Sequence, residues 1–500
     1  MDIRGKDAYG TKQPRGPATT LIDLVTRDDQ DSAFFPSNAK VSRFTRNEGV
    51  RTVPLSTVFR EFTFKGPADF GQTFIFDLNN TMCGDLLQRL FIQVRVGDWL
   101  TRLERERLET GIYSFQNNNT AWTYINSLGT ALLNEATLEV DDQILEKITG
   151  DTCSVVSTLF PDLNTQVGLS DTTGRVTLPQ MKAWTGSSIL PTDDDWITIP
   201  LCFSFLRERL TATFPLTACR DGTVRVRISL KRFDQVVRSV SGKKAQDDTP
   251  MGKSVGLYDL RYATYGLIVL NTSTPVIAPK LRSIQLLTHG IFVDGPYREM
   301  LLRQPFERPF REIQQFDFTE PLKYVVNKNG GDSITVQLPL EANQPIEEIV
   351  WFLRRKSAVR QNNDWVNFSA VLESDYDPVF SPLEPLLISA KLQGNGMDII
   401  SQDEKWFRSH ISRAHKSGRV AYESFIYGYS FADHPAEHNP TGSINASRLS
   451  SLRLSLEVRP PTITSANDSS VDTEWEVHVF VFAFQWLRFE NGICNKLFID

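Results

Sequence analysis

The chain has 500 residues, a net charge of −6 at pH 7 and an apolar fraction of 40%. This length allows about two to four domains with a large core. The positive charges form no long run, so nothing in the sequence suggests the basic stripe typical of a nucleic-acid groove. The five cysteines are scattered and show no CxxC spacing, so we expect reduced thiols rather than a disulfide framework.

The N-terminus is polar and mixed in charge, unlike a signal peptide. The longest apolar stretch, Val477–Leu487, is much shorter than the ~20 residues that a membrane helix requires. It also alternates like a strand and is apolar on both sides, so we expect it to be buried on both faces. One face should line a barrel core, and the other should pack on the first domain or on a neighbouring subunit. We therefore expect no transmembrane segment.

Short strands dominate the chain after a polar N-terminal arm. Period-two alternation marks strands with one buried face at Val58–Phe64, Gln72–Leu78, Leu90–Val96 and Thr223–Phe233. Residues 131–148 read as two strands joined at Asp141 and Asp142. Helical periodicity is weak, apart from pieces such as Leu100–Leu108 and Cys153–Leu159. Many short strands with long polar loops predict an all-β sandwich or barrel.

Four short pieces of sequence recur in the same order. Glu61–Phe64 resembles Gln315–Phe318 and Leu133–Leu138 resembles Leu387–Leu392, both at an offset of 254 residues. Phe203–Phe205 resembles Tyr429–Phe431 and Val226–Leu230 resembles Leu452–Leu456, both at an offset of 226. A two-copy repeat of this length predicts two similar domains rather than a solenoid.

The repeat gives the following domain bounds. We predict an N-terminal arm at 1–54, a first domain at 55–275, a linker at 276–289, a second domain at 290–490 and a C-terminal tail at 491–500. Tyr262–Leu270 should close the first domain, and Val477–Leu487 should close the second. Val240–Ser254 is then an exposed loop inside the first domain.

Several segments resemble the major capsid proteins of the nucleocytoplasmic large DNA viruses. They include Ala68–Gly71 with Gly84–Leu87, Ala121–Leu145 and Trp196–Cys219. The most specific piece resembles the family's Pro-x-Gly-x-x-Asn-x-Ser-Arg signature, here Pro440, Gly442, Asn445, Ser447 and Arg448. The resemblance extends from about residue 20 to 490. The region 282–302 and the Leu86-Leu87 pair depart from the family pattern.

The resemblance implies an all-β fold of two tandem eight-stranded jelly rolls, a double jelly roll. It implies a structural capsid protein that trimerises into pseudo-hexagonal capsomers of an icosahedral shell. Within the family, a minor or penton capsid paralogue and an assembly scaffold are alternatives. The implied partners are neighbouring capsomers and minor capsid, cement and penton proteins, with an internal viral membrane reached only through other proteins. The implied location is the virion, with assembly in the host cytoplasm.

Candidate chemical sites are few. His434 and His438 have a four-residue spacing, but Pro435 and Pro440 disfavour a metal-binding helix. His410 and His415 give no stronger signal, and Asp193–Asp195 read as a solvated loop rather than the facing carboxylates of a glycosidase. No catalytic motif, cofactor fingerprint or metal-ligand set is found, so we expect no enzyme activity, no cofactor and no metal site.

One alternative of another class and one modification site stay open. Jelly rolls also occur in carbohydrate-binding and hydrolytic proteins, and fold alone does not fix function. Of six glycosylation sequons, Asn118 lies in a predicted loop and is the best candidate acceptor.

Overall fold

The structure is a computed structural model of the 500-residue chain. It describes residues 53–97, 120–175, 196–207, 212–244, 258–266, 281–321, 333–356, 359, 363–370, 384–415, 425–459 and 474–498. Leu55–Asp500 form one compact unit. Within the described part of the chain, no helix is both long and apolar enough to span a bilayer.

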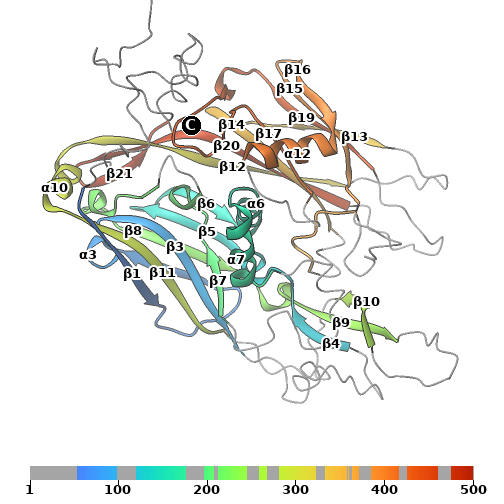
Figure 1. The fold of residues 1–500 in the computed structure, drawn as a ribbon, viewed down its shortest axis with the longest axis horizontal. Helices are drawn as coiled ribbons and strands as arrows, with labels where there is room; N and C mark the ends of the chain where they lie inside the picture. The colour runs from blue at the N-terminus through green and yellow to red at the C-terminus, as the bar shows by residue number, and fades with distance from the viewer. Residues whose placement is uncertain are drawn as a thin grey trace, which may run out of the picture. The chain divides into compact units, whose positions relative to one another are not determined.

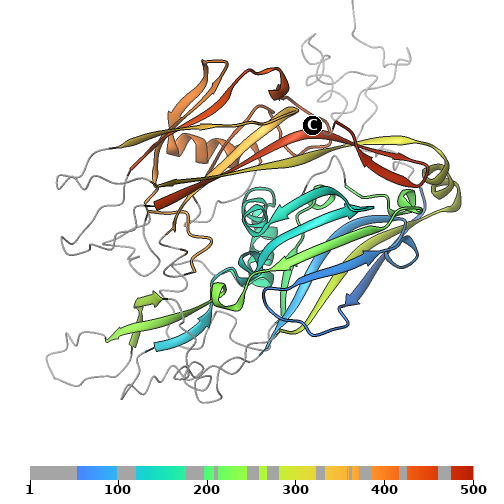
Figure 2. The same cartoon turned by 180° about the vertical axis from the view of Figure 1, so that it is seen from behind.

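The first jelly roll consists of two four-stranded antiparallel sheets (Figures 1 and 2). One sheet has the order β1 (Leu55–Thr63), β11 (Leu281–Val293), β3 (Leu86–Val96) and β7 (Trp196–Pro200). We call it the first outer sheet. The other has the order β2 (Thr73–Leu78), β8 (Val224–Leu230), β5 (Leu133–Val140) and β6 (Gln143–Thr149).

The second jelly roll repeats this order. Its first sheet follows β12 (Phe306–Pro321), β20 (Glu474–Glu490), β14 (Pro345–Arg355) and β17 (Ile426–Ser430). We call it the second outer sheet because its strand order corresponds to that of the first outer sheet, although it faces the first roll. Two short strands extend this sheet, because β18 (Ile444–Asn445) pairs with β14 and β21 (Ile493–Lys496) pairs with β20. The other sheet follows β13 (Ile334–Pro339), β19 (Leu452–Val458), β15 (Leu387–Gly394) and β16 (Met397–Asp403).

The sequence repeat is confirmed by these matching positions. Glu61–Phe64 and Gln315–Phe318 fall on β1 and β12, the first strand of each roll. The other pairs fall on or beside β5 and β15, β7 and β17, and β8 and β19. The predicted turn at Asp141-Asp142 joins β5 to β6, and both residues take positive φ angles, 50° and 65°. Two consecutive left-handed residues match a tight hairpin turn.

Four predicted boundaries are corrected by the strand pairing. The predicted linker at 276–289 is wrong, because 281–289 belong to β11, which pairs with β1 and β3 at the centre of the first outer sheet. The first roll is therefore closed by β11 and not by residues 262–270. The predicted tail at 491–500 contains β21. The predicted loop at 240–254 begins inside a strand, and residues 245–254 lie outside the described part.

A third group of strands and several helices complete the fold. The strands β4 (Thr120–Tyr124), β9 (Val237–Lys244) and β10 (Tyr258–Gly266) form a three-stranded sheet in the order β10-β9-β4. The helices are α3 (Asn80–Cys83), α5 (Leu128–Leu132), α6 (Gly150–Leu159), α7 (Leu163–Thr173), α9 (Ser204–Arg207), α10 (Gly295–Arg303) and α12 (Glu404–Ala414). The 3-10 turns are η1 (Leu216–Cys219), η2 (Phe233–Gln235) and η4 (Ala446–Arg448). The predicted helix at 153–159 is confirmed by α6, whereas 100–108 lie outside the described part.

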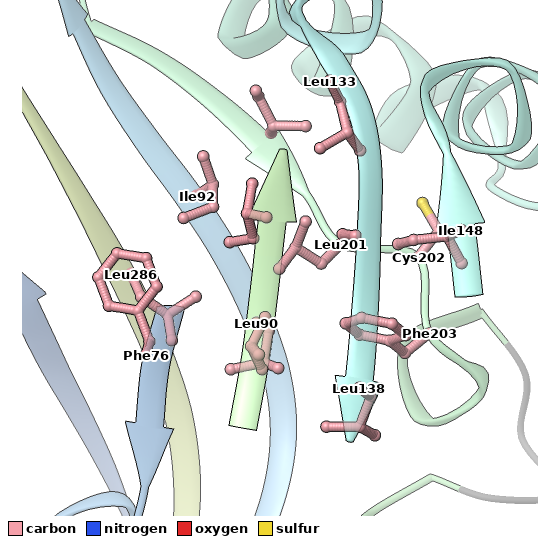
Figure 3. Packing of buried hydrophobic residues seen from close by; sticks show 14 of the residues in the cluster. Phe76, Leu90, Ile92, Leu133, Leu138, Ile148, Leu201, Cys202, Phe203 and Leu286 are labelled. Carbon is pink, nitrogen blue, oxygen red and sulfur yellow. The ribbon is translucent and has the colours of Figure 1, made fainter. Parts of the chain in front are cut away.

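Alternating apolar residues fill the space between the two sheets of each roll. In β8, Val224, Val226, Ile228 and Leu230 are buried, while the residues between them are partly or fully exposed. Figure 3 shows Phe76 of β2 lying beside Leu286 of β11, with Leu90 and Ile92 of β3 nearby, in the buried cluster of the first roll. A second buried cluster fills the other roll. Burial of apolar area is the main stabilising term for such a fold.

Candidate functional site: the contact between the two rolls

Among the described residues, the two rolls are joined by an apolar contact, a buried ion pair and several hydrogen bonds. Helix α6 of the first roll places Val155 and Leu159 in the buried cluster of the second roll. The ring of Phe160, just after α6, lies 5.5 Å from the ring of Phe482 on β20. The aromatic face of β20 therefore packs on the first roll at Phe482, which confirms that alternative for Val477–Leu487. Toward the end of the strand, Trp486 remains 39% exposed.

A cluster of charges is buried beside this apolar contact. Arg354 on β14 donates hydrogen bonds to both carboxylate oxygens of Asp151 on α6, at 2.8 and 3.2 Å, and to Oε1 of Glu476 at 2.7 Å. His478 contacts Glu476 at 3.2 Å and Asp317 on β12 at 2.5 Å. The side chain of Arg354 is only 3% exposed. One arginine thus bridges a helix of the first roll and two strands of the second.

The pKa values in this cluster follow from burial and from the opposite charges. Burial alone would lower the pKa of His478, but hydrogen bonds to Asp317 and Glu476 outweigh it and raise the pKa to about 9. Burial would raise the pKa of Asp151, but the charges of Arg354 and His478 hold it at about 2. For Glu476, burial is outweighed in the same way by His478 and Arg354, and the pKa is about 2. The cluster is therefore ionised at neutral pH.

A second polar cluster links the rolls through α9. Glu146 on β6 accepts hydrogen bonds from the backbone N–H and the hydroxyl of Ser204 and from Arg207 at 2.9 Å. Arg207 also donates to the backbone carbonyl of Arg311 on β12. Arg311 in turn pairs with Glu347 on β14, and both side chains are at most 1% exposed. Each of these two buried ion pairs lies within one roll, and the hydrogen bond from Arg207 to the carbonyl of Arg311 joins them across the contact. This bond favours one orientation of the two rolls, because another orientation would leave a buried donor of Arg207 without its acceptor.

A third contact is made by residues 363–370, which follow β14 in the chain. The side-chain amide of Asn363 donates to the backbone carbonyls of Asp234 and Val237, at 2.7 and 2.8 Å. The indole N–H of Trp365 donates to the carbonyl of Gln235 at 2.9 Å. The ammonium of Lys231 lies 4.1 Å from the centre of the Trp365 ring, within cation–π range. Burial lowers the pKa of Lys231 to about 8.

Sequence reasoning missed these contact residues. Arg354 and Arg355 end the apolar run Ile349–Leu353, and Glu476 and His478 interrupt the apolar run of β20. A charge inside a strand that is otherwise apolar on both faces is the signal that could have identified them, because a buried charge requires a partner.

The predicted signature residues form a turn at the edge of the second outer sheet. Asn445 and Ile444 pair with Pro345 and Ile346 of β14. The hydroxyl of Ser447 accepts a hydrogen bond from the backbone N–H of Gln344 at 2.9 Å. Gly442 packs against the backbone, since a Cβ atom there would lie 2.4 Å from the carbonyl oxygen of Phe431. Pro440 and Arg448 are exposed. The signature residues thus hold this turn close to the backbone at Phe431, beside β14.

The other predicted candidates are not brought together. Asn118 and Asp193–Asp195 lie outside the described residues. His434 contacts Asp433 and Thr441. His410 stacks on Trp406 with ring centres 4.6 Å apart, and His415 pairs with Glu348 at 2.7 Å. Among the residues that the structure describes, no group of three or more His, Cys, Asp and Glu side chains could hold a metal ion.

Two family models match this chain. The model of the large eukaryotic DNA virus major capsid protein matches residues 312–495, and the model of the major capsid protein N-terminus matches residues 51–278. These ranges fall on the second and the first roll.

Curated relatives and solved structures agree with the models. The chain is 34% identical over 107 residues to the major capsid protein of Phaeocystis pouchetii virus, which is 21% of this chain and 19% of that protein. It is 25% identical over 228 residues to the major capsid protein of Pyramimonas orientalis virus, which is 41% of this chain and 47% of that protein. The aligned parts thus span less than half the length of these two relatives.

The likeness to solved structures concerns the fold. The capsid model of PBCV-1 virus matches with a TM-score of 0.64 and 16% identity, over 91% of this chain and all of the other. The Faustovirus major capsid protein matches with a TM-score of 0.60 and 11% identity, over 93% of this chain and 94% of the other. The relatives named here are structural capsid proteins and not enzymes. Because the two family models together match residues 51–278 and 312–495, the chain belongs to the major capsid protein family of the large eukaryotic DNA viruses.

Proposed function

We propose that this protein is the structural subunit of an icosahedral capsid of a large DNA virus, and that three copies form one pseudo-hexagonal capsomer. The observation that carries the proposal is the repeated strand order, β1-β11-β3-β7 and β12-β20-β14-β17, in two rolls joined by the buried ion pair of Arg354 and Asp151. A rigid pair of similar rolls is a suitable unit for a repeating shell.

The number three is taken from the resemblance to the capsid family, and geometry gives a reason for it. Three copies of a two-roll protein around a threefold axis present six similar rolls, and six similar rolls tile a hexagonal lattice. Closed rings made by rotation are the usual arrangement of identical subunits. Closed jelly rolls also leave few free strand edges, which limits unwanted pairing between densely packed β proteins.

The proposed partners are other copies of this chain, neighbouring capsomers, and minor capsid, cement and penton proteins. The proposed setting is the virion, after assembly in the host cytoplasm, with an internal membrane contacted only through other proteins. The exposed signature turn around Arg448 is available for such contacts, because it is a fixed feature at the edge of a sheet.

Electron microscopy of the purified protein tests the proposal. Negatively stained particles should show threefold objects with a hexagonal outline. Single, separate two-roll particles at micromolar concentration would contradict a capsomer. In that case, a glycan array would test the carbohydrate-binding alternative.

A further inference from the structure

The second roll also contacts the first roll at the C-terminal end of β20. There β20 forms a hairpin with β21, in which Phe489 lies opposite Cys494. Leu487, Phe489 and Cys494 belong to the buried cluster of the first roll and not to that of their own roll. This hairpin of the second roll therefore contributes to the core of the first roll.

Strand β21 packs on the turn η1 of the first roll (Figure 1). The backbone N–H of Asp221, which follows η1, donates a hydrogen bond to the carbonyl oxygen of Gly492 at 3.2 Å. The ring of Phe214, which precedes η1, lies 5.8 Å from the ring of Phe489. Backbone and side-chain contacts thus hold β21 against η1.

Two thiols meet in this contact, one from each roll. Cys219 is the last residue of η1, and Cys494 lies in β21. They are 3% and 1% exposed, and their side chains are in hydrogen-bonding contact. The Sγ atom of Cys219 also lies 3.8 Å from the carbonyl oxygen of Pro215. The two cysteines are far apart in the chain, since 494 − 219 = 275 residues.

A second pair of thiols lies inside the first roll. Cys153 of α6 and Cys202, which follows β7, are in contact with each other. Their Sγ atoms lie 3.7 and 3.5 Å from the carbonyl oxygen of Pro200. Figure 3 shows Cys202 beside Ile148 within the buried cluster. A bond between these two thiols would join two segments of the same roll.

The two pairs differ in how a reagent can reach them. The residues on either side of Cys153 and of Cys202 are buried, whereas those on either side of Cys494 are exposed. Strand β21 is only four residues long, and short strands with exposed side chains open at lower cost than core strands. While β21 is in place, the hydrogen bond to Cys219 and burial raise the pKa of the Cys494 thiol, so it stays protonated and reacts slowly.

We propose that Cys219 and Cys494 form a disulfide bond that links the two rolls when the protein meets a low-molecular-weight disulfide such as oxidised glutathione. The inference does not depend on how many copies form a capsomer. It concerns the thiols that the structure brings together from the two rolls.

The reaction is a double thiol–disulfide exchange. When β21 opens, the thiolate of Cys494 attacks one sulfur of the oxidant, whose S–S bond breaks and releases one thiolate. The thiolate of Cys219 then attacks the sulfur of Cys494 in this mixed disulfide and releases the second thiolate. The two protein thiols lose two electrons and two protons, and the oxidant becomes two thiols.

Such a pair responds to its surroundings. Reduced glutathione in a cytosol keeps exposed thiols reduced, and an oxidising setting outside a cell favours the disulfide. The bond closes a loop of 275 residues, which restricts the unfolded chain and so stabilises the folded one. The two rolls are then held at two places, by this bond at β21 and by the ion pair of Arg354 and Asp151 at α6.

Thiol counting on the folded full chain tests the proposal. The protein is incubated with oxidised glutathione, quenched with acid and alkylated with N-ethylmaleimide in denaturant. Of the five thiols, 5 − 2 = 3 should be alkylated, and digestion should release two peptides joined through Cys219 and Cys494. A reductant added before alkylation should restore all five. Five free thiols, glutathione adducts alone, or a bond between Cys153 and Cys202 in place of the predicted one would overturn the inference.

Serine variants provide matched controls. Cys219→Ser and Cys494→Ser should each lose the linked peptides. Cys83→Ser should keep them, because the thiol of Cys83 contacts the backbone of Asn79 and the side chain of Thr288 rather than another thiol. Linked peptides that persist in Cys494→Ser would show that the bond was assigned to the wrong residues.

Hydrogen exchange on the unmodified chain gives a second readout that needs no variant. The amides of Ile493–Lys496 should exchange more slowly in the oxidised protein than in the reduced one, because the bond holds β21 on η1. The amides of β16 should exchange equally in both forms, since β16 pairs with β15 in the other sheet of the second roll. Equal exchange of β21 in the two forms would contradict the inference.

Discussion

Arg354 of the second roll and Asp151 of the first roll form a bidentate ion pair, with both N···O distances at or below 3.2 Å. The pair joins segments more than two hundred residues apart, since 354 − 151 = 203. Asp151 lies in the first turn of α6, where the helix dipole also favours a negative charge. The contact therefore fixes the start of α6 on the face of β14.

Removal of this arginine should be costly. Arg354→Ala leaves Asp151 without its paired cation and Glu476 with His478 alone, and breaking a buried ion pair costs about 3–5 kcal/mol of unfolding free energy. Arg225→Ala is the control, because its partners Asp77 and Asp142 are 69% and 82% exposed and such pairs contribute about 1 kcal/mol or less. Urea unfolding would measure both, and equal losses would contradict a special role for Arg354.

The same cluster predicts a dependence of stability on pH. The pKa of His478 is about 9 in the folded protein, above its ordinary 6.5, so its contribution is complete below pH 6.5 and is lost as pH rises toward 9. Between pH 6.5 and 8 the loss is about 2 kcal/mol, at 1.36 kcal/mol for each pH unit. Above pH 8 the unfolding free energy should decrease less steeply. The reason is that Lys231, with a pKa of about 8, becomes neutral in the folded state before it does in the unfolded state, which opposes the effect of His478.

His478→Gln isolates this effect. The variant should be less stable than the parent at pH 6.5, and the difference should shrink by about 2 kcal/mol at pH 8. At low pH both proteins should lose stability as pH falls from about 4 toward 2, because Asp151 and Glu476, with pKa values of about 2 when folded, are protonated earlier in the unfolded state. A difference that stays constant from pH 6.5 to 8 would show that His478 acts through packing alone.

The signature turn gives a prediction about glycine. Gly442→Ala puts a methyl group 2.4 Å from the carbonyl oxygen of Phe431, so the turn must move and unfolding free energy should fall by about 1–3 kcal/mol. Gly168→Ala is the control, because nothing lies within 4 Å of the added carbon in α7. That change should be neutral or stabilise by about 0.5–1 kcal/mol through helix propensity. A loss at Gly168 as large as that at Gly442 would contradict the steric argument.

The place of β11 predicts the result of cutting the chain. A protease site inserted at residues 245–257 should be cleaved readily, because the small and polar residues of this segment, among them two Gly and two Asp, are typical of preferred cleavage sites. The two fragments should nevertheless elute together from a sizing column. β11 follows the cut and pairs along its length with β1 and β3, which precede it. Fragments that separate without denaturant would contradict this pairing.

Much of the fold was predictable because strand alternation and the repeat are local signals. The similarity between Val226–Leu230 and Leu452–Leu456 is enough to match two strands of the different rolls, β8 and β19. The sequence did not identify β11 as a central strand of the first outer sheet. In β11, His289 and Gly290 interrupt the alternation, and Gly290 is required by the close approach of the Cys83 carbonyl, which lies far away in the sequence.

The contact between the rolls was predicted only in outline. The doubly apolar β20 indicated that its second face must be covered. The sequence could not identify α6 as the covering element, because helix α6 and strands β14 and β20 come together only through tertiary packing. The ion pair of Arg354 with Asp151 depends on the same packing.

The central claim is that this chain is the subunit of a trimeric capsid building block. Size-exclusion chromatography with multi-angle light scattering, at micromolar concentration in dilute buffer, tests it most directly. We predict the mass of three 56.7-kDa chains, about 170 kDa. Obligate interfaces of this kind commonly bury more than ~2,000 Å², so the mass should not fall on moderate dilution. A stable species of 56.7 kDa that shows no tendency to form trimers would contradict the account.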